Sequence, residues 1–333
     1  MNIRIFFTVL GLLSALCVWS QQTERRYLSG TGLGDGVTWQ FYCSEGRNSG
    51  KWSKLQGFGE YTYGRWYKKK GVKNPSMEEG IYRHTFRVPE DWRGKNIRLW
   101  FDGVMTDTDV IVNGVSAGET HRGGFYRFSY DITSLLKYGA ANKLEVRVKK
   151  HSGNKSVNAA ERKADWWLFG GIYRPVWLEA KPQIRIEHIA VDAKMDGEMQ
   201  LYTELKGVKG KEKLTAALHP LDGTDVCSEV RMWEVGHDGV FAHIWKNVEP
   251  WTPEKPRLYN LIVTLRNEEG EALHRTSVRV GFRTVDFRPR DGVYLNGTKL
   301  VMKGINRHSF HPDGGRTTNK ELSIQDALLI KET

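Results

Sequence analysis

Cysteine, long apolar runs and internal repeats are scarce or missing in this chain of 333 residues. Its three cysteines, Cys17, Cys43 and Cys227, are too few for a small fold held together by disulfides. The longest apolar run, Ile5–Val18, offers about fourteen residues, whereas a helix that crosses a bilayer needs about 20. No repeat period and no low-complexity linker is visible. The chain is therefore expected to fold as ordinary globular domains.

The apolar run falls within residues 1–20, which have the pattern of a secretory signal peptide. A short positive start precedes the run, and the residues before Gln21 are acceptable cleavage flanks. A membrane anchor is one alternative, but the apolar run is short for a bilayer span. A lipid attached at Cys17 is another, but the residues before Cys17 fit a lipid attachment signal poorly. We therefore expect export to the periplasm or secretion, without a membrane span. Cys43 and Cys227 fall in different predicted domains, so no structural disulfide is expected.

Acidic residues are in the minority, since 50 Lys and Arg stand against 39 Asp and Glu and give a net charge of +11. Such a surplus raises nucleic acid as a partner. The densest basic runs are only Lys68–Lys70 and Lys149-Lys150, and the other basic residues often alternate with apolar ones. That pattern favours solvated strand faces and loops over a phosphate-binding groove. We expect no nucleic-acid partner.

Tryptophan is abundant, with 12 residues in a chain that is 39% hydrophobic and 27% charged. Trp and Tyr suit flat contacts to apolar faces such as those of sugar rings. The length leaves room for two domains of ordinary size and a piece of a third. We predict a mostly β fold with domains at 21–181 and 182–287, followed by a partial domain at 288–333.

Residues 21–181 predict a two-sheet sandwich, because short alternating strands are separated by turn signals. The strands are expected at Ile81–Val88, Asn96–Phe101, Val110–Val112, Leu144–Val148 and Tyr173–Leu178. Asn113-Gly114 predicts a tight hairpin turn. Asp131–Tyr138 predicts the one helical turn of this domain, with Thr133 or Ser134 as its cap.

Residues 182–287 predict a second sandwich of about 100 residues and roughly seven strands, which suits an immunoglobulin-like fold. Strands are expected at Ile184–Val191, Leu258–Leu265 and Ser277–Phe282, with a turn at Glu268-Glu269-Gly270. No cysteine pair of the antibody type is present, so the likeness is one of architecture.

The stretch Gly292–Arg316 has the pattern of a strand, a tight Asn296-Gly297 turn, and a second strand at Leu300–Ile305. Polar residues follow that strand directly, which is where an α/β barrel places its working side chains. A capping box at Thr318–Glu321 then starts a predicted helix. The apolar positions of this helix are Leu322, Ile324, Leu328 and Ile330. The pattern predicts the first strand and part of the first helix of a truncated barrel.

The most distinctive run is Asp165–Val176, with an acidic residue, two tryptophans and the pair Gly170-Gly171, which permits a sharp bend. One interpretation is a loop whose Trp side chains plug the end of the sandwich and whose Asp caps a turn. The other is a loop that contacts a sugar. The residues alone leave both open.

Five sets of motifs, in order along the mature chain, resemble the N-terminal part of glycoside hydrolase family 2, which holds β-galactosidases, β-glucuronidases and β-mannosidases. The first sandwich carries Gly80-Ile81-Tyr82-Arg83 with Phe86, Val88 and Pro89, then Val110–Gly114, Gly118 and Phe125–Thr133, and finally Phe169–Arg174. The second carries Trp251, Pro253, Pro256–Tyr259 and Gly281-Phe282-Arg283, and the barrel entry carries Leu295-Asn296-Gly297 and Lys303–His308.

The resemblance implies a jelly-roll sugar-binding sandwich, an immunoglobulin-like sandwich and a (β/α)8 barrel. It implies a retaining β-glycosidase that hydrolyses O-glycosidic bonds of oligo- or polysaccharides, with a Glu acid/base and a Glu nucleophile about 5 Å apart. Both lie on later barrel strands in the family, so no catalytic residue is expected in this chain and both are expected beyond Thr333. Asn267-Glu268 imitates the acid/base pair but falls in a predicted turn, and we reject it.

Two substrate-binding residues carry over by position. His308 matches a histidine that contacts the sugar, and Asp165 matches an aspartate that accepts hydrogen bonds from substrate hydroxyls. The alternative for His308 is a histidine whose hydrogen bonds are all made within the barrel mouth. The alternative for Asp165 is an aspartate that caps a turn. Asn306 and Arg307 either touch substrate or brace the loop. In some members the aspartate ligates a cation, so a bound cation near Asp165 is the one cofactor the resemblance allows.

Arg65 is a departure from the galactosidase-like pattern, which places an Asn there. An Arg pairs bidentately with carboxylates, so one hypothesis is an acidic or decorated sugar. A surface-loop Arg is the alternative.

A zinc site at His308, His311 and Asp313 is disfavoured, because the spacing lies on a Pro- and Gly-rich loop without helical geometry; no metal site is expected. The expected partner is a carbohydrate substrate, and the complete enzyme is expected to form a homo-oligomer. The alternative function is a carbohydrate-binding or adhesion protein without catalysis, although such a protein has no need of a barrel entry.

Overall fold

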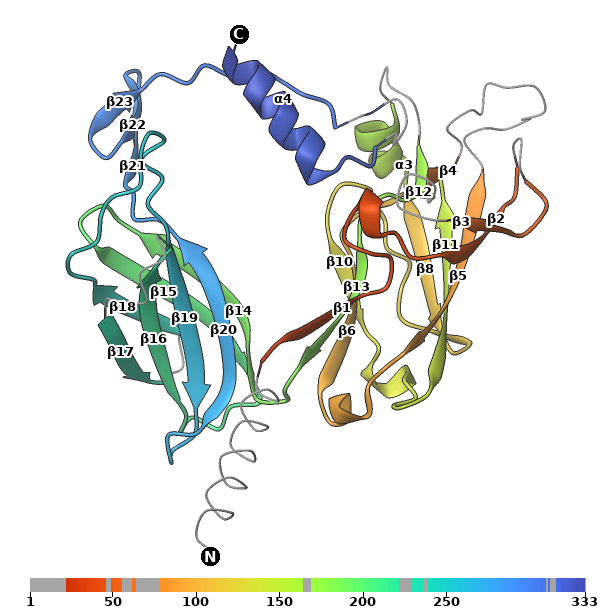
Figure 1. Ribbon diagram of the computed structural model, residues 1–333, viewed down its shortest axis with the longest axis horizontal. Coiled ribbons are helices and arrows are strands. Elements are labelled where there is room, and N and C mark those ends of the chain that lie inside the picture. The colour runs from red at the N-terminus through yellow and green to blue at the C-terminus, as the bar shows by residue number, and fades with distance from the viewer. Residues whose placement is uncertain are drawn as a thin grey trace, which may run out of the picture. The chain divides into compact units, whose positions relative to one another are not determined.

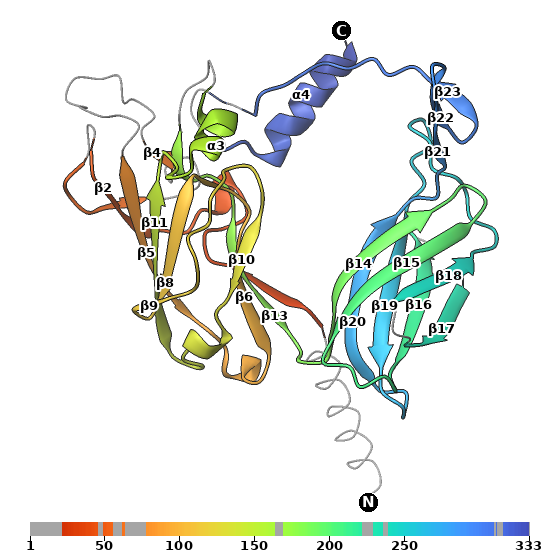
Figure 2. The ribbon, with the colours of Figure 1, turned by 180° about the vertical axis from the view of Figure 1, so that it is seen from behind.

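The computed structural model describes residues 22–45, 49–55, 62–63, 78–163, 169–221, 229–235, 239–309, 311 and 316–332. The predicted signal peptide lies outside these residues. The chain divides into two compact units (Figures 1 and 2). Each unit has its own core of buried hydrophobic side chains. Here the first unit comprises residues 24–180 and 306–333, and the second unit comprises residues 181–305 with the segment that ends at Thr23. The prediction of a mostly β chain is confirmed.

Two main antiparallel sheets build the sandwich of the first unit. The four-stranded sheet has the order β1 (Glu24–Tyr27), β13 (Val176–Lys181), β6 (Asn96–Phe101) and β10 (Phe128–Asp131). The six-stranded sheet has the order β3 (Ser53–Leu55), β2 (Trp39–Cys43), β5 (Glu79–Arg87), β11 (Ala141–Lys149), β8 (Asp107–Val112) and β9 (Val115–Ser116). A small sheet of β4 (Thr62–Tyr63), β12 (Gly170–Ile172) and β7 (Val104–Met105) accompanies them.

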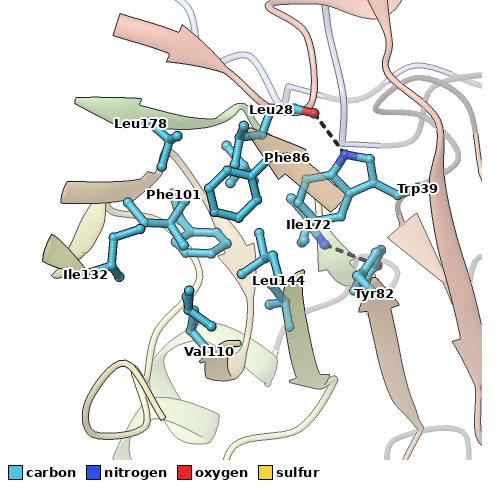
Figure 3. Close-up of a cluster of buried hydrophobic side chains, with 14 of the residues drawn as sticks. Leu28, Trp39, Tyr82, Phe86, Phe101, Val110, Ile132, Leu144, Ile172 and Leu178 are labelled. Atoms are coloured by element: carbon cyan, nitrogen blue, oxygen red, sulfur yellow. Dashed lines mark hydrogen bonds between the residues drawn. The ribbon is translucent and has the colours of Figure 1, made fainter. Parts of the chain in front are cut away.

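Strict alternation along the strands creates the core of the first unit. In β11 every second residue is buried, and Leu144 is 1% exposed between polar neighbours that face outward. Figure 3 shows Leu144 against Phe86, Phe101 and other buried side chains of both sheets. Two polar atoms in this core are paired: Trp39 Nε1–H donates to the Leu28 carbonyl at 3.0 Å, and the Tyr82 hydroxyl accepts from the Ile172 N–H at 3.3 Å (Figure 3). Each buried large apolar side chain contributes about 1.5–3 kcal/mol.

The predicted hairpin at Asn113-Gly114 is confirmed. Both residues have positive φ, 52° and 87°, and Val112 pairs with Val115 across the two-residue turn. The predicted helical turn is a 3₁₀ turn, η3 (Thr133–Leu135), but its predicted cap is wrong. The Asp131 carboxylate accepts from the Thr133 N–H at 3.0 Å, because the Thr133 hydroxyl oxygen is occupied in accepting from the Ile97 N–H.

The predicted strand Tyr173–Leu178 is wrong at its start. β12 ends at Ile172 and β13 begins at Val176, so Tyr173, Arg174 and Pro175 lie between two sheets. Pro175 has no N–H to donate to a ladder, while its carbonyl accepts from the Asp102 N–H at 2.9 Å. The sequence also did not reveal a short helical segment, α3 (Lys155–Val157) with η4 (Asn158–Arg162), which Asn154 caps.

The second unit contains a sandwich that has seven strands among the described residues, in agreement with the predicted number. One sheet has the order β14 (Arg185–Ala193), β15 (Glu198–Lys206) and β18 (Val240–Ile244). The other has the order β17 (Glu229–Glu234), β16 (Lys213–Pro220), β19 (Tyr259–Arg266) and β20 (Ala272–Val280). Side chains from both sheets, including Leu201, Leu214 and Leu261, are 0% exposed and form its core together with Phe282, which follows β20.

A three-stranded meander follows the second sandwich: β21 (Val285–Arg288), β22 (Gly292–Leu295) and β23 (Thr298–Leu300). The predicted turn between the last two strands is confirmed, with φ of 51° at Asn296 and 80° at Gly297. Asn296 also anchors the meander, because its side chain donates to the Trp251 carbonyl and accepts from the Thr284 N–H.

The predicted strand Leu300–Ile305 is wrong beyond Leu300. Residues 301–305 have no strand structure, and Val301, Met302 and Ile305 are 77%, 72% and 66% exposed. A barrel strand is held by parallel neighbours on both sides, and the described residues supply none for this stretch. The barrel entry is therefore not formed here as predicted.

The predicted C-terminal helix is confirmed as α4 (Lys320–Glu332). Its cap is Asn319, whose side-chain oxygen accepts from the Leu322 N–H at 2.8 Å, and not the predicted box at Thr318. Ile324 and Leu328 are 49% and 55% exposed. The helix thus forms from local capping and propensity rather than from burial of its apolar face.

Candidate functional site

The segment that carries Asp165 is closed at its base by one hydrogen bond. Residues 164–168 lie outside the described residues, whereas Arg162 and Phe169 on either side are described. The guanidinium of Arg162, which is 5% exposed, donates from Nη2 to the Phe169 carbonyl at 2.5 Å. Because this bond spans seven positions, it holds the two ends of the intervening segment together. The predicted loop that carries Asp165 is thus bracketed by two residues that this bond joins.

The base of this loop packs against a compact polar and aromatic cluster. The Glu161 carboxylate accepts from the Gly124 N–H at 2.7 Å, and the Tyr173 hydroxyl donates to the Gly124 carbonyl at 2.5 Å. Met105, Phe169 and Tyr173 are buried together beneath it. Burial raises the pKa of the Tyr173 phenol, so the hydroxyl keeps the proton that it donates.

The chain just before α4 reaches the same cluster. The hydroxyl of Thr317, which is 5% exposed, donates to the Tyr173 carbonyl at 3.2 Å. The Arg316 guanidinium lies 5.6 Å from the centre of the Phe125 ring, a cation–π contact. Tyr173 therefore links the flank of the Asp165 loop to the segment that follows the predicted barrel entry.

The structure describes three of the five predicted substrate-binding residues. Asn306, Arg307 and His308 are exposed, and the Arg307 guanidinium forms an ion pair with Asp326 of α4. The ion pair favours the bracing interpretation for Arg307. Asp165 and Arg65 lie outside the described residues.

Sequence reasoning missed the groups that position the loop, namely Arg162, Glu161, Gly124 and Thr317. No spacing signal connects them: the Arg162 bond spans seven positions, and Glu161 and Thr317 bond partners 37 and 144 positions away. Of this cluster, Phe169 and Tyr173 belong to the run Asp165–Val176 that the sequence singled out.

Asn267 and Glu268 lie in the turn between β19 and β20, where the sequence placed them. The Asn267 amide donates to the Glu271 carboxylate at 2.9 Å, and Glu268 forms an exposed ion pair with Lys211.

Among the described residues, no three His, Cys, Asp or Glu side chains are grouped so that they could hold a metal ion. No helix in the described part of the chain has the length and apolar character needed to cross a bilayer.

Two family models match the chain in succession. Residues 54–182 match the sugar binding domain of glycosyl hydrolases family 2, and residues 180–283 match a second model of glycosyl hydrolases family 2. The chain thus belongs to glycoside hydrolase family 2, as its motifs predicted.

Relatives with assigned names agree with this family. A β-galactosidase of Thermoanaerobacter pseudethanolicus is 34% identical over 259 residues, which cover 75% of this chain and 34% of the relative. A putative β-glucuronidase of Formosa agariphila is 29% identical over 256 residues, which cover 75% of this chain and 30% of the relative. The chain therefore spans about a third of the length of these relatives.

Solved structures show the same architecture. A β-glucuronidase of Bacteroides uniformis superposes with a TM-score of 0.71 at 26% identity, over 93% of this chain and 38% of that protein. A β-glucuronidase of Faecalibacterium prausnitzii superposes with a TM-score of 0.72 over 93% of this chain and 54% of that protein. At 22% identity, the second likeness concerns the fold alone.

Proposed function

We propose that this chain is the front part of an exported retaining β-glycosidase that hydrolyses O-glycosidic bonds of β-galactosides or β-uronides. Its family and its relatives named β-galactosidase and β-glucuronidase support this proposal. Export rests on the signal-peptide pattern of residues 1–20. A homo-oligomer of the complete enzyme belongs to the same proposal.

The observation that carries the proposal is the closed base of the Asp165 loop. Arg162, Glu161 and Tyr173 fix both flanks of the loop within the first sandwich. Thr317 attaches the segment after the predicted barrel entry to the same cluster. Such a base suits a carboxylate that the sandwich presents to a sugar held by a barrel, because a rigid support limits the entropy lost on binding.

We place both catalytic Glu residues outside these 333 residues, since the relatives extend over about three times the aligned length. In that arrangement, Asp165 and His308 bind sugar hydroxyls, while Asn306 and Arg307 support the loop. A cation bound near Asp165 is the only cofactor that this arrangement allows.

Asp165→Asn in a protein extended through the complete reading frame is expected to lower kcat/KM for an aryl β-glycoside about 100-fold. The amide removes the charge that accepts hydrogen bonds from substrate hydroxyls, a loss of about 2.7 kcal/mol. Initial rates with aryl β-galactoside and β-glucuronide measure the effect. Asp192→Asn, a change at an exposed ion pair in the second unit, is the control and should leave the rates unchanged. Hydrolysis at enzyme-like rates by the 333-residue chain alone would contradict the placement of the catalytic residues.

Arg65→Ala in the complete protein is expected to separate neutral from acidic substrates. If Arg65 pairs with the substrate carboxylate, kcat/KM for a galacturonide falls about 10- to 100-fold, while that for the matching galactoside stays the same. Rates on the two substrates, which differ only at C6, give the ratio directly. An equal loss of kcat/KM on both substrates would show that Arg65 does not bind the substrate carboxylate.

A further inference from the structure

A broad groove lies on the outer face of the six-stranded sheet of the first unit. Its volume is about 810 Å³, and polar side chains of four strands line it, five of them charged. These are Lys54 of β3, Arg83 of β5, and Lys143, Glu145 and Arg147 of β11, with Gln40 of β2 between them. The groove lies on the face opposite the core, since Tyr82 and Val146, the neighbours of these residues in sequence, are 0% exposed.

Strand register sets these side chains side by side. Gln40 pairs with Lys54 on one side and with Arg83 on the other, and Arg83 pairs with Glu145. Residues directly opposite in an antiparallel pair lie about 5 Å apart, so the row crosses four neighbouring strands without a gap. Residues separated by more than 90 positions in the sequence thereby form one continuous polar surface.

The groove is electropositive. Four cationic side chains, Lys54, Arg83, Lys143 and Arg147, face one carboxylate, Glu145, which leaves a surplus of three positive charges. Glu145 accepts from Arg83 Nε at 2.7 Å and from Arg147 Nε at 2.8 Å. Partial burial acts to raise the pKa of Glu145, but these hydrogen bonds and charges hold it below its usual value, so the carboxylate stays ionised.

The central carboxylate orients the two guanidinium groups and leaves other donors of each exposed. Arg83 and Arg147 have side chains that are 49% and 48% exposed, and each guanidinium carries five N–H groups. Neither Lys54 nor Lys143 has an ion-pair partner among the described residues. The groove therefore offers oriented donors and free ammonium groups to an anion.

An aromatic surface borders the charged row. Trp52 is 43% exposed, and the Arg83 guanidinium lies 4.3 Å from its ring centre. Tyr42 packs against Trp52 with ring centres 5.6 Å apart. Exposed indole rings bind the apolar faces of sugars, and stacking of Arg83 on Trp52 restricts its guanidinium plane.

We propose that this groove binds an anionic polysaccharide, a chain of sugar residues that carry carboxylate or sulfate groups. The basic side chains would pair with the anionic groups, Trp52 would contact a ring face, and Gln40 with Thr85 would bind hydroxyls. The site lies entirely within the first sandwich, so it goes beyond the proposed glycosidase activity and does not depend on it. A DNA duplex is the less fitting occupant, because its bases are stacked inside the double helix and offer no exposed ring face to Trp52.

Binding by the intact 333-residue chain tests the proposal without any assay of catalysis. Affinity electrophoresis and calorimetry at physiological salt would use polygalacturonate, dextran sulfate, neutral dextran and a DNA duplex as separate ligands. The groove variant is Lys54→Gln/Lys143→Gln, which removes two exposed ammonium groups. The matched control is Lys246→Gln/Arg279→Gln, which removes the same charge from exposed positions in the second unit.

We expect polygalacturonate or dextran sulfate to bind, and the groove variant to weaken that binding about tenfold, equivalent to about 1.4 kcal/mol. The polymer that binds more tightly identifies the anionic group. The control should retain its affinity, and neutral dextran should bind at least tenfold more weakly than the anionic polymer. Trp52→Ala and Arg147→Gln provide second variants if the double variant does not fold. Equal losses in groove and control variants, no binding of either anionic polymer, or tighter binding of DNA through the same lysines would overturn the proposal.

Discussion

Lys150→Met is expected to lower the free energy of unfolding of the first unit by about 3–5 kcal/mol, because it leaves a buried carboxylate without its main countercharge. Lys150 and Glu78 form an ion pair at 2.8 Å whose side chains are 0% and 1% exposed. Lys150 follows β11 and Glu78 precedes β5, and the Lys150 N–H donates to the Glu78 carbonyl. The pair thus continues the ladder between two central strands of the six-stranded sheet.

The pair is costly to break because neither charge can return to water. Burial raises the pKa of Glu78 and lowers the pKa of Lys150, while the hydrogen bond between them opposes both shifts. Burial also raises the pKa of the neighbouring Cys43 thiol to about 11, so the thiol is neutral and adds no charge beside the pair. The remaining buried carboxylate must take up a proton or draw in water, and either change disrupts the packing.

A double-mutant cycle separates the pair from its surroundings. Lys150→Met/Glu78→Leu removes both charges and should recover most of the lost stability, since buried ion pairs are often replaced by apolar groups at little cost. Lys206→Met, at an exposed ion pair with Glu204, is the control and should cost less than about 1 kcal/mol. Urea unfolding with pulsed amide exchange on β5 and β11 assigns the effect to the first unit. A single variant no worse than the control would contradict the argument.

Alternation and turn chemistry allowed much of the two sandwiches to be predicted. β6 has the predicted bounds, and β11 extends the predicted strand by a few residues, because each has one buried and one solvated face. The two Asn-Gly turns were also predictable, since positive φ at two successive positions strongly favours these residues. Local rules therefore suffice where the element is set by its own side chains.

Local sequence rules fail where contacts with a distant part of the chain decide whether a strand forms. Leu300–Ile305 has the composition of a buried strand, but a strand forms only beside a neighbour, and the described chain offers none beyond Leu300. Tyr173–Leu178 has a strand-like composition as well, yet the contacts of Tyr173 and Pro175 with other loops interrupt it. In both cases the missing information is tertiary.

In the candidate sites too, local motifs were predictable and tertiary contacts were not. Motifs led to Asp165 and His308, but nothing in the sequence indicated that Arg162 closes the loop base. The basic residues of the groove appeared in the sequence as scattered charges on strand faces, which is correct for each residue alone. Their meeting on one face depends on the register between β2, β3, β5 and β11, and register cannot be read from separate strands.

His274→Gln is expected to flatten the acid dependence of the stability of the second unit. His274 of β20 is 0% exposed, and burial, assisted by the nearby charges of Lys181 and Arg185, lowers its pKa from 6.5 to about 4. Its ring is fixed from both sides: Nδ1 accepts from the Ile186 N–H at 3.1 Å, and Nε2 lies 3.0 Å from the Thr23 hydroxyl. Since Nδ1 is an acceptor, the neutral ring carries its proton on Nε2.

The direction of the pH effect follows from this depressed pKa. The folded state favours the neutral ring, so its stability is fully present above pH 6.5 and is lost as the pH falls toward 4, where the unfolded chain already binds the proton. The loss amounts to about 3 kcal/mol between pH 7 and pH 4. A second proton on Nδ1 would also face the Ile186 N–H, which removes that hydrogen bond.

The measurement is the difference in free energy of unfolding between wild type and His274→Gln at pH values from 7 to 4. Urea unfolding with pulsed amide exchange on β19 and β20 reports the second unit, and taking the difference cancels the carboxylates that titrate in both proteins. The free energy of unfolding of wild type minus that of His274→Gln should decrease by about 3 kcal/mol from pH 7 to pH 4. Thr23→Val is the control: it removes one hydrogen-bond partner but keeps the titrating ring, so its stability should fall at every pH without flattening. If the difference between wild type and His274→Gln stayed constant with pH, His274 would be protonated as readily in the folded chain as in the unfolded one, and the buried neutral ring would be wrong.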